Sequence, residues 1–238
     1  MAGRGSRFSK AGYSLPKPLI PIHKKSMIQC VIENITPNRE HNFIFICLDE
    51  HLREFNMETV LTSIVPNCRI IGINEVTEGA ACTVLSAREY INNEEMLMIA
   101  NSDQFVDVSI DCYLDSMYEK DGLIMTMKAS HPKWSYIIYD ENKMVKYLQE
   151  KKVISDEATV GIYNFRQGKD YVYYAEKMIE KNTRTNGEFY VAPVYNEMIS
   201  DEKKIYYYNV GAENKGMYGL GTPEDLHYFR SLHLSEKY

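Results

Sequence analysis

The chain has 238 residues, of which 45% are hydrophobic and 25% are charged, and this composition excludes an extensively disordered protein. No apolar run approaches the roughly 18 residues that a membrane span needs, and the first residues lack the hydrophobic stretch of a secretion signal, so we expect a soluble, cytoplasmic protein. The five cysteines are widely spaced without a C-x-x-C pair, and the six histidines have no ligand spacing, which indicates reduced core thiols and argues against a zinc site.

The first part of the chain is basic, whereas the rest is acidic. Residues 1–32 contain six Lys and Arg and no acid, so the net charge of −6 combines +6 on this segment with −12 on the remainder. An acidic body with a locally basic segment suits a small phosphate-bearing anion better than nucleic acid. A solvated basic tail is the alternative.

The opening segment, residues 1–22, contains several glycines and prolines and does not look like a helix. Gly3 and Gly5 allow backbone N–H groups to cradle phosphates, although the segment completes neither a dinucleotide fingerprint nor a P-loop. Arg7 and Lys17 would neutralise the phosphate charge, and the prolines on either side of Lys17 would hold it in an extended conformation.

Between residues 43 and 120, apolar runs with the length of strands alternate with amphipathic segments. This alternation predicts βαβ units, and hence an α/β fold with a Rossmann-like, mostly parallel sheet covered by helices on both faces. The predicted strands are Phe43–Leu48, Arg69–Ile73 and Met96–Ala100, and the predicted helices are Leu52–Ser63, Ala80–Asn92 and Val108–Lys120.

After Asp121 the chain changes character, because strand-like runs follow one another without helices between them. The runs GLIMTMKA, SYIIYDENKMVKYLQE and TVGIYNF predict antiparallel hairpins, with a turn at YDENKM. Two helices are predicted next, followed by the strand KIYYYNV and a last helix that starts at Pro223 with Thr222 as its N-cap. The two helices are Asp170–Lys181 and Glu188–Ser200.

The opening segment, GRGSRFSKAGYSLPKPLIPI, resembles the GxGxR…PKP signature of the sugar-phosphate nucleotidyltransferases, where it wraps the phosphates of a nucleoside triphosphate. Five later stretches resemble further family motifs: NEVTEGAACTVLSA, NSDQ, YLQEKKVISDEATVGIYNF, NGEFYVAPVYNEMI and GLGTPEDL. The resemblance covers nearly the whole chain. It implies a single nucleotidyltransferase domain, with a nucleotide-binding core (1–121), a small antiparallel acceptor lobe with helices (122–210) and a closing helix (211–238).

The resemblance also implies the site residues. The expected catalytic residues are Arg7 and Lys17, and the expected nucleotide-binding residues are Ala2, Gly3, Gly5, Ser6, Asn74, Thr77, Gly79 and Ala80. Asp103 would hold Mg²⁺, Lys151 and Glu188 would contact the phosphorylated acceptor, and Trp134 would form a wall of the acceptor site. Taken singly, each of these four also has an ordinary structural explanation, as a turn residue, a solvated lysine, a helix-start acid or a lobe aromatic.

Three residues depart from the family pattern. Gly219 stands where a second metal-binding aspartate is expected, Ala192 stands where an aspartate follows the EFY motif, and Lys152 replaces a usual proline. A non-catalytic nucleotide- or sugar-binding regulatory protein is therefore the alternative to an enzyme.

The amino-acid sequence of the opening segment is most similar to those of the bacterial capsule-locus branch of the family. This branch includes cytidylyltransferases, one of which acts on phosphoglutamine. This similarity implies CTP and a phosphorylated small molecule, either phosphoglutamine or a sugar phosphate, as substrates in capsule or surface polysaccharide synthesis. Neither nucleic acid nor a membrane is an expected partner, and a homo-oligomer stays open.

The resemblance finally raises a question about the start of the chain. In this family a short apolar strand delivers the chain to the phosphate loop, and Met1 and Ala2 stand where that strand would end. A sheet without it would contain unpaired backbone groups at its centre. We therefore expect the natural protein to begin several residues upstream of Met1.

Overall fold

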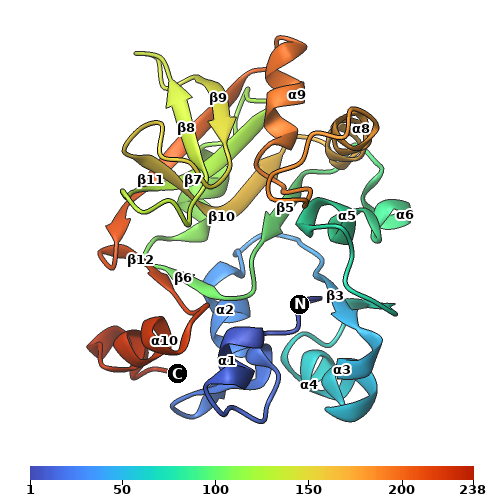
Figure 1. Ribbon diagram of the computed structural model, residues 1–238, viewed down its shortest axis with the longest axis vertical. Helices are drawn as coiled ribbons and strands as arrows, with labels where there is room; N and C mark the ends of the chain where they lie inside the picture. Colours follow the sequence, from blue (N-terminus) through green and yellow to red (C-terminus); the bar gives the residue numbers. More distant parts are fainter. The chain divides into compact units, whose positions relative to one another are not determined.

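The computed structural model describes residues 1–238, which form two compact units (Figure 1). Unit 1 consists of Met1–Val76, Asn101–Asp111 and Asn214–Tyr238, and unit 2 consists of Thr77–Ala100 and Cys112–Glu213. Each unit therefore combines segments that are far apart in the sequence. The functional division at residues 121 and 210 stays a prediction. No helix in either unit combines the length and the apolar character required to cross a membrane.

Unit 1 consists of short helices and strands. Its first elements are α1 (Ser6–Lys10), the 3-10 helix η1 (Lys17–Leu19), β1 (Pro21–Ile22), β2 (Lys25–Ser26), α2 (Met27–Ile35), β3 (Ile44–Leu48), α3 (Asp49–Glu54), α4 (Met57–Ile64) and β4 (Arg69–Ile73). Its later elements are β6 (Gln104–Val106), β12 (Gly216–Gly219), α10 (Pro223–Arg230) and η2 (His233–Ser235), and α7 (Ile110–Asp115) continues from this unit into unit 2.

A two-stranded parallel sheet and its packing helices form the core of unit 1. β3 pairs with β4 in parallel, with Ile44 opposite Arg69. Ser26 starts α2 as its N-cap, because its hydroxyl accepts a hydrogen bond from the Gln29 N–H (3.3 Å). Truncating one large aliphatic core residue to alanine is expected to cost about 2–5 kcal/mol of stability. One buried cluster of this core consists of Ile28, Ile32, Phe45, Cys47, Met57 and Leu61. The strand expected upstream of Met1 stays a prediction.

The antiparallel pair of β6 and β12 fixes the position of Asp103. Beyond the end of β12, the Leu220 N–H donates to the Asp103 carbonyl oxygen (2.8 Å). Asn34 of α2 holds the other end of β6, since its side-chain amide donates to the Val106 carbonyl and accepts from the Val106 N–H, each at 2.8 Å. Asp103 consequently stands just before β6, next to the turn that leads into α10.

Unit 2 is built around a mixed sheet with strand order β11-β7-β10-β8-β9, and β5 also pairs with β10. β7 and β11 are parallel, and the other pairs in this unit are antiparallel. Its elements are α5 (Ala80–Leu85), α6 (Arg88–Ile91), β5 (Leu97–Ala100), β7 (Gly122–Lys128), β8 (Tyr136–Tyr139), β9 (Val145–Gln149), β10 (Glu157–Phe165), α8 (Gly168–Glu180), α9 (Val194–Ser200) and β11 (Ile205–Glu213).

The long strand β10 changes partners along its length. Its first half pairs with β8, with Ala158 opposite Tyr136, and its second half pairs with β5, with Ile162 opposite Ala100. Gly161, at the change, has φ 82°, a conformation that glycine adopts readily. Figure 1 shows α8 and α9 beside these strands, and α9 contacts β9 and β11.

Aromatic side chains fill the core of unit 2. Tyr195 stacks on Phe165 with ring centroids 4.5 Å apart, and its hydroxyl donates to the Asn164 carbonyl (2.8 Å). The Tyr171 hydroxyl donates to the Ala81 carbonyl (2.9 Å) and so ties α8 to α5. Because these rings are buried and their hydroxyls are satisfied, these tyrosines serve packing.

The expected α/β class is confirmed, and so are the strands at 69–73 and the Thr222 cap of α10. Two of the long helices predicted from the sequence are wrong, because each is divided into two shorter helices. The one expected over Leu52–Ser63 is two helices, α3 and α4, because Asn56 between them adopts a left-handed conformation (φ 48°). The one expected over Ala80–Asn92 is likewise divided into α5 and α6.

Further corrections concern helix ends and the opening segment. The helix expected from Val108 contracts to α7, and the helix expected from Glu188 begins only at Val194 as α9. Glu188 instead lies in a turn, where its N–H donates to the Thr185 carbonyl (3.0 Å). The opening segment contains the helix α1, and Lys17 starts the 3-10 helix η1 rather than an extended stretch, since Pro18 is compatible with the first turn of a helix. The sequence analysis also missed α2, β6 and β12.

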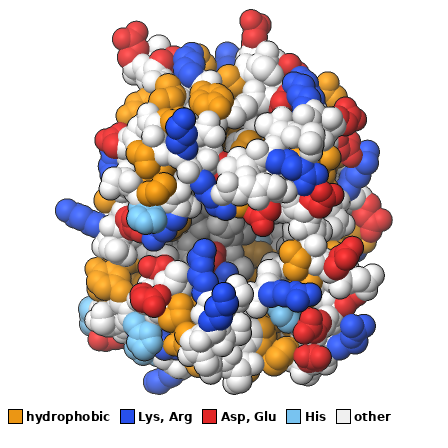
Figure 2. Space-filling model, viewed as in Figure 1, with side chains coloured by type: hydrophobic (Ala, Val, Ile, Leu, Met, Phe, Trp, Pro, Cys, Tyr) orange, Lys and Arg blue, Asp and Glu red, His pale blue; other side chains and the backbone are white.

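The surface carries charges of both signs. Figure 2 shows Lys and Arg side chains interspersed with Asp and Glu over the visible face, with hydrophobic side chains in small groups. All five cysteines are unpaired: Cys30 and Cys47 are buried, and Cys112 is exposed.

Candidate active site

A lysine–aspartate pair lies beside the glycine loop of unit 1, which we define as residues 3–5. Lys17 Nζ donates to Asp103 Oδ2 at 2.8 Å, and both side chains remain about one-quarter exposed, at 23% and 27%. Burial alone would raise the pKa of the Asp103 carboxyl, but the charges of Lys17 and Arg7 hold it below its ordinary value. The carboxylate therefore stays ionised and keeps its second oxygen for another cation.

Gly5 allows the loop to approach Lys17 closely. Its φ is 62°, and a Cβ at this position would lie 3.2 Å from Lys17 Cβ. Its carbonyl accepts the Phe8 N–H (2.9 Å) at the start of α1. Phe8 is buried and anchors this short helix, so that Arg7 projects from a fixed element. Of the other predicted loop residues, Ala2 is buried, whereas Gly3 and Ser6 are exposed.

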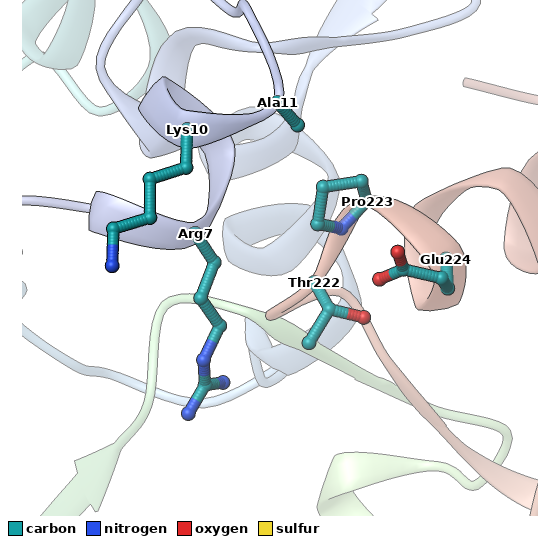
Figure 3. Close-up of a pocket in the computed structure, with 6 residues that line it drawn as sticks. All are labelled: Arg7, Lys10, Ala11, Thr222, Pro223 and Glu224. Carbon is teal, nitrogen blue, oxygen red and sulfur yellow. The ribbon is translucent and has the colours of Figure 1, made fainter.

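A cavity of about 340 Å³ adjoins α1 and the start of α10. Figure 3 shows Arg7 and Lys10 extending from α1 on one side, and Thr222, Pro223 and Glu224 at the start of α10 on the other. The Thr222 hydroxyl caps α10 by accepting the Asp225 N–H (3.1 Å). Arg7, Lys10 and the N-terminus of α10 favour an anionic group in this cavity, whereas the Glu224 carboxylate opposes one.

The carboxylates of unit 1 suit a magnesium ion that is shared with a nucleotide. Mg²⁺ is usually held by one or two protein carboxylates together with substrate phosphates and water. Asp103 is ionised, and its Oδ2 would lie only 2.8 Å from a Cβ at Gly221, so the absence of a side chain there makes room for it. Gly219 supplies no carboxylate, but Oδ2 of Asp225 would lie 3.3 Å from a Cβ at that position. The residues present are therefore compatible with the ion, and Asp103 would be its main protein ligand.

Unit 2 brings Lys151 and Glu188 together through a residue that the sequence analysis missed. The Lys151 ammonium donates to the Tyr190 hydroxyl, which in turn donates to Glu188 Oε2. The ammonium also lies 4.4 Å from the centroid of the Tyr190 ring. Burial, together with the Glu188 carboxylate, raises the pKa of Tyr190, so the hydroxyl keeps its proton.

The backbone of Lys151 is held beside Trp134. Lys151 adopts a left-handed conformation (φ 54°), which is uncommon for a residue with a side chain, and its N–H donates to the Trp134 carbonyl (3.1 Å). The Trp134 indole N–H donates to Glu213 Oε2 at 3.4 Å, and Lys133 Nζ lies 4.7 Å from the indole ring centre. Lys133 also pairs with Glu213 Oε1 (2.6 Å). The predicted acceptor wall is thus a fixed aromatic surface flanked by charges of both signs.

Glu150 is a second residue that the sequence analysis missed. It is 7% exposed and accepts a hydrogen bond from the Ser135 hydroxyl. Burial raises the pKa of its carboxyl, and the neighbouring charge of Lys151 opposes the rise. Its position immediately before Lys151 was the available signal, and the place of Tyr190 in the EFY motif was the signal for that residue.

The predicted base-recognition segment is divided between the units. Asn74 belongs to unit 1, whereas Thr77, Gly79 and Ala80 belong to unit 2. In unit 2 this segment is bound to the acceptor residues, because the Phe189 N–H donates to the Glu78 carbonyl (2.8 Å) and the Ala81 N–H donates to the Phe189 carbonyl (3.0 Å). The segment is also tied by the Thr77 hydroxyl, which donates to the Gly79 carbonyl (2.9 Å).

The family model described as Nucleotidyl transferase matches residues 1–230, nearly the whole chain. This chain belongs to the nucleotidyl transferase family. The match includes the glycine loop, Lys17, Asp103 and the Lys151–Tyr190–Glu188 cluster, so the family-level resemblance of the sequence analysis is confirmed.

Curated relatives of this nucleotidyl transferase include proteins described as bifunctional protein GlmU. That of Methanococcus maripaludis strain C5 is 28% identical over 172 residues, which are 69% of this chain and 38% of the relative. That of strain S2 is 27% identical over 233 residues, which are 94% of this chain and 51% of the relative. The chain thus spans about half the length, or less, of these relatives.

Solved structures share its fold. The nucleoside-diphosphate-sugar pyrophosphorylase of Vibrio cholerae RC9 matches with a TM-score of 0.86 and 24% identity, over 98% of both chains. The inositol-1-phosphate CTP transferase of T. maritima matches with a TM-score of 0.74 and 12% identity, over 94% of this chain and 88% of the other. At these identities the likeness establishes the nucleotidyl transferase fold.

Proposed function

We propose that this nucleotidyl transferase moves CMP from CTP onto a phosphorylated small molecule, phosphoglutamine or a sugar phosphate, and releases pyrophosphate during capsule or surface polysaccharide synthesis in the cytoplasm. The observation that carries this proposal is the ionised Asp103 paired with Lys17 (2.8 Å) beside the glycine loop. This is an arrangement that suits a triphosphate with its metal ion.

The proposed reaction needs no general base. The acceptor phosphate is already an anionic nucleophile, and its oxygen forms a bond to the α-phosphorus as the bond from that phosphorus to the bridging oxygen breaks and pyrophosphate leaves. Arg7 and Lys17 neutralise charge on the triphosphate and on the departing pyrophosphate. Mg²⁺, when bound, supplies further neutralisation of phosphate charge, with Asp103 as its protein ligand. Lys151, Glu188 and Trp134 orient the acceptor.

The proposed preference for CTP rests on residues 74–80. Cytosine presents an amino group where uracil presents a carbonyl oxygen. A backbone carbonyl of this segment facing that position would pair with cytosine and face an acceptor in uracil. Leaving such a group unpaired costs about 1–3 kcal/mol, or roughly a 5-fold to 150-fold preference.

The second candidate is a nucleotide- or sugar-binding regulatory protein with weak or no turnover. The observation in its favour is Gly219, where no side-chain carboxylate is available to a metal ion. The paired Lys17 and Asp103 favour the enzyme, because they offer a cation for the departing pyrophosphate together with a carboxylate for a metal ion.

A matrix of four nucleoside triphosphates against a panel of phosphorylated acceptors, with Mg²⁺ and pyrophosphate release as the readout, separates the two candidates. The enzyme releases pyrophosphate only when a triphosphate and a suitable acceptor are both present. Binding of nucleotide with no pyrophosphate release in any combination would favour the regulatory protein.

A further inference from the structure

The Tyr190 hydroxyl separates an ammonium from a carboxylate. It accepts a hydrogen bond from Lys151 Nζ and donates its own proton to Glu188 Oε2. Because both hydrogen bonds share one oxygen atom, Lys151 and Glu188 are neighbours that do not touch. No direct ion pair between them is present.

This arrangement leaves the Lys151 ammonium with binding capacity. An ammonium has three donors, of which the Tyr190 hydroxyl takes one. A neutral hydroxyl is a weaker partner than a carboxylate, since hydrogen bonds between ionised groups are shorter and roughly twice as strong. A phosphate therefore competes more easily for an ammonium held by Tyr190 than for one held directly by Glu188.

The surroundings of Lys151 make this separation necessary. The buried carboxyl of Glu150 is its neighbour in sequence, and its raised pKa reflects both burial and the negative charge of Glu188. The Trp134 carbonyl holds the Lys151 backbone (3.1 Å), and the hydroxyl and ring of Tyr190 hold its ammonium. If the hydroxyl were absent, Lys151 and Glu188 would both lose the partner that they share, and a direct pair between them would replace it.

We propose that Tyr190 is a positioning residue, which holds Lys151 and Glu188 apart so that Lys151 can bind the phosphate of the acceptor. The inference rests on the proposed function, in which Lys151 meets the acceptor phosphate. Tyr190 acts through Lys151, and its hydroxyl takes no part in the chemical step.

Inorganic phosphate tests the inference without turnover. Trp134 is the only tryptophan in the chain, and its carbonyl holds Lys151, so its fluorescence reports on this cluster. We expect phosphate to change this fluorescence in the wild type and in Lys17→Ala, which removes a cation of unit 1, but not in Lys151→Gln. No saturable change in the wild type, or an unchanged titration in Lys151→Gln, would overturn the phosphate site.

The decisive variants separate positioning from simple structural support. Tyr190→Phe should raise the dissociation constant for phosphate about tenfold, because Glu188 then pairs with Lys151 directly. Adding Glu188→Gln to Tyr190→Phe should restore phosphate binding to within about threefold of the wild type. The control is Tyr173→Phe, at an exposed tyrosine (58%), which should bind phosphate as the wild type does.

Two results of the phosphate titrations contradict the role of Tyr190: unchanged phosphate binding in Tyr190→Phe, or a double variant that binds as weakly as the single one. With an active acceptor, Tyr190→Phe should raise the KM for the acceptor and leave the KM for CTP and kcat within about twofold. A fall in kcat alone would also contradict it. Failure of the proposed function has a different signature, namely phosphate binding as described but no pyrophosphate release with any acceptor.

Discussion

Gly79 and Phe189 are packed backbone against backbone. A Cβ at Gly79 would lie 2.3 Å from the Phe189 carbonyl oxygen and 2.5 Å from its nitrogen, and Gly79 has φ 136°. Phe189 stands between Glu188 and Tyr190, so this contact joins the predicted base-recognition segment to the predicted acceptor residues. A shift of either segment would be transmitted to the other through this contact.

Gly79→Ala should destabilise the protein, because the added methyl group cannot be accommodated without moving the Phe189 backbone. Overpacking of this kind costs about 1–3 kcal/mol, or a few degrees in the midpoint of thermal unfolding for a chain of this size. The control is Gly3→Ala, where a Cβ would meet no atom within 4 Å. An equal, small effect of both substitutions on the unfolding midpoint would mean that the close contact is absent.

Arg7→Ala and Lys17→Ala should each lower turnover by roughly 10²-fold or more, since one preorganised charge-stabilising group is typically worth about 2.7–4 kcal/mol. Lys24→Ala removes an exposed cation from the same basic segment and should leave turnover unchanged. Steady-state rates of pyrophosphate release check the three variants. Turnover near the wild-type value in Arg7→Ala or Lys17→Ala would remove the phosphate-cradle interpretation.

The sequence could predict most strands, because their apolar runs are short and bounded by turns, and a family motif singled out the residues that are predicted to bind phosphate. It could not predict where helices break. The break between α3 and α4 depends on the left-handed conformation of Asn56, and an asparagine in an amphipathic run gives no sign of its backbone angles. The start of α2 at Ser26 was missed although the cap is an ordinary one.

The acceptor cluster was only partly predictable for a related reason. Lys151 and Glu188 were expected to serve one acceptor, and the structure joins them through Tyr190. Tyr190 lies in the EFY motif, but the sequence alone does not show that its hydroxyl is placed between an ammonium and a carboxylate, whereas those of Tyr171 and Tyr195 are buried in the core. Only the fold determines which hydroxyl meets an ammonium.

Asp103→Asn should abolish activity at ordinary Mg²⁺ concentrations and leave the fold intact, because an amide is a poorer ligand for Mg²⁺ than a carboxylate. Far-ultraviolet circular dichroism and thermal unfolding check the fold, and a Mg²⁺ titration of the residual rate checks the metal. Asp107→Asn, at an exposed carboxylate in the same segment, serves as the control. A Mg²⁺ dependence in Asp103→Asn equal to that of the wild type contradicts the assignment.

Glu150 should make stability fall as the pH rises above 4.5, the ordinary pKa of its carboxyl. Burial raises this pKa in the folded protein, so over the interval between the two values the folded state keeps a proton that the unfolded state has lost. The stabilisation is complete below 4.5 and disappears as the pH passes through the raised value. Glu150→Gln keeps an acceptor for Ser135 and should remove this part of the pH dependence.

Denaturant unfolding of the wild type and Glu150→Gln at a series of pH values measures the difference directly. Glu141→Gln, at an exposed position in the turn between β8 and β9, is the control and should follow the wild type. If Glu150→Gln and the wild type lose stability in parallel from acid to neutral pH, the Glu150 carboxyl does not carry a raised pKa.

The central claim is that this chain transfers a nucleotide, and the most direct measurement is the joint yield of pyrophosphate and nucleotide-linked acceptor from CTP and Mg²⁺, compared with UTP. The account predicts equal amounts of the two products, a rate with CTP about fivefold or more above that with UTP, and a decrease of roughly 10²-fold or more in both products in Lys17→Ala. Tight binding of CTP with neither product formed from any phosphorylated acceptor, or the same rate in Lys17→Ala as in the wild type, would contradict it.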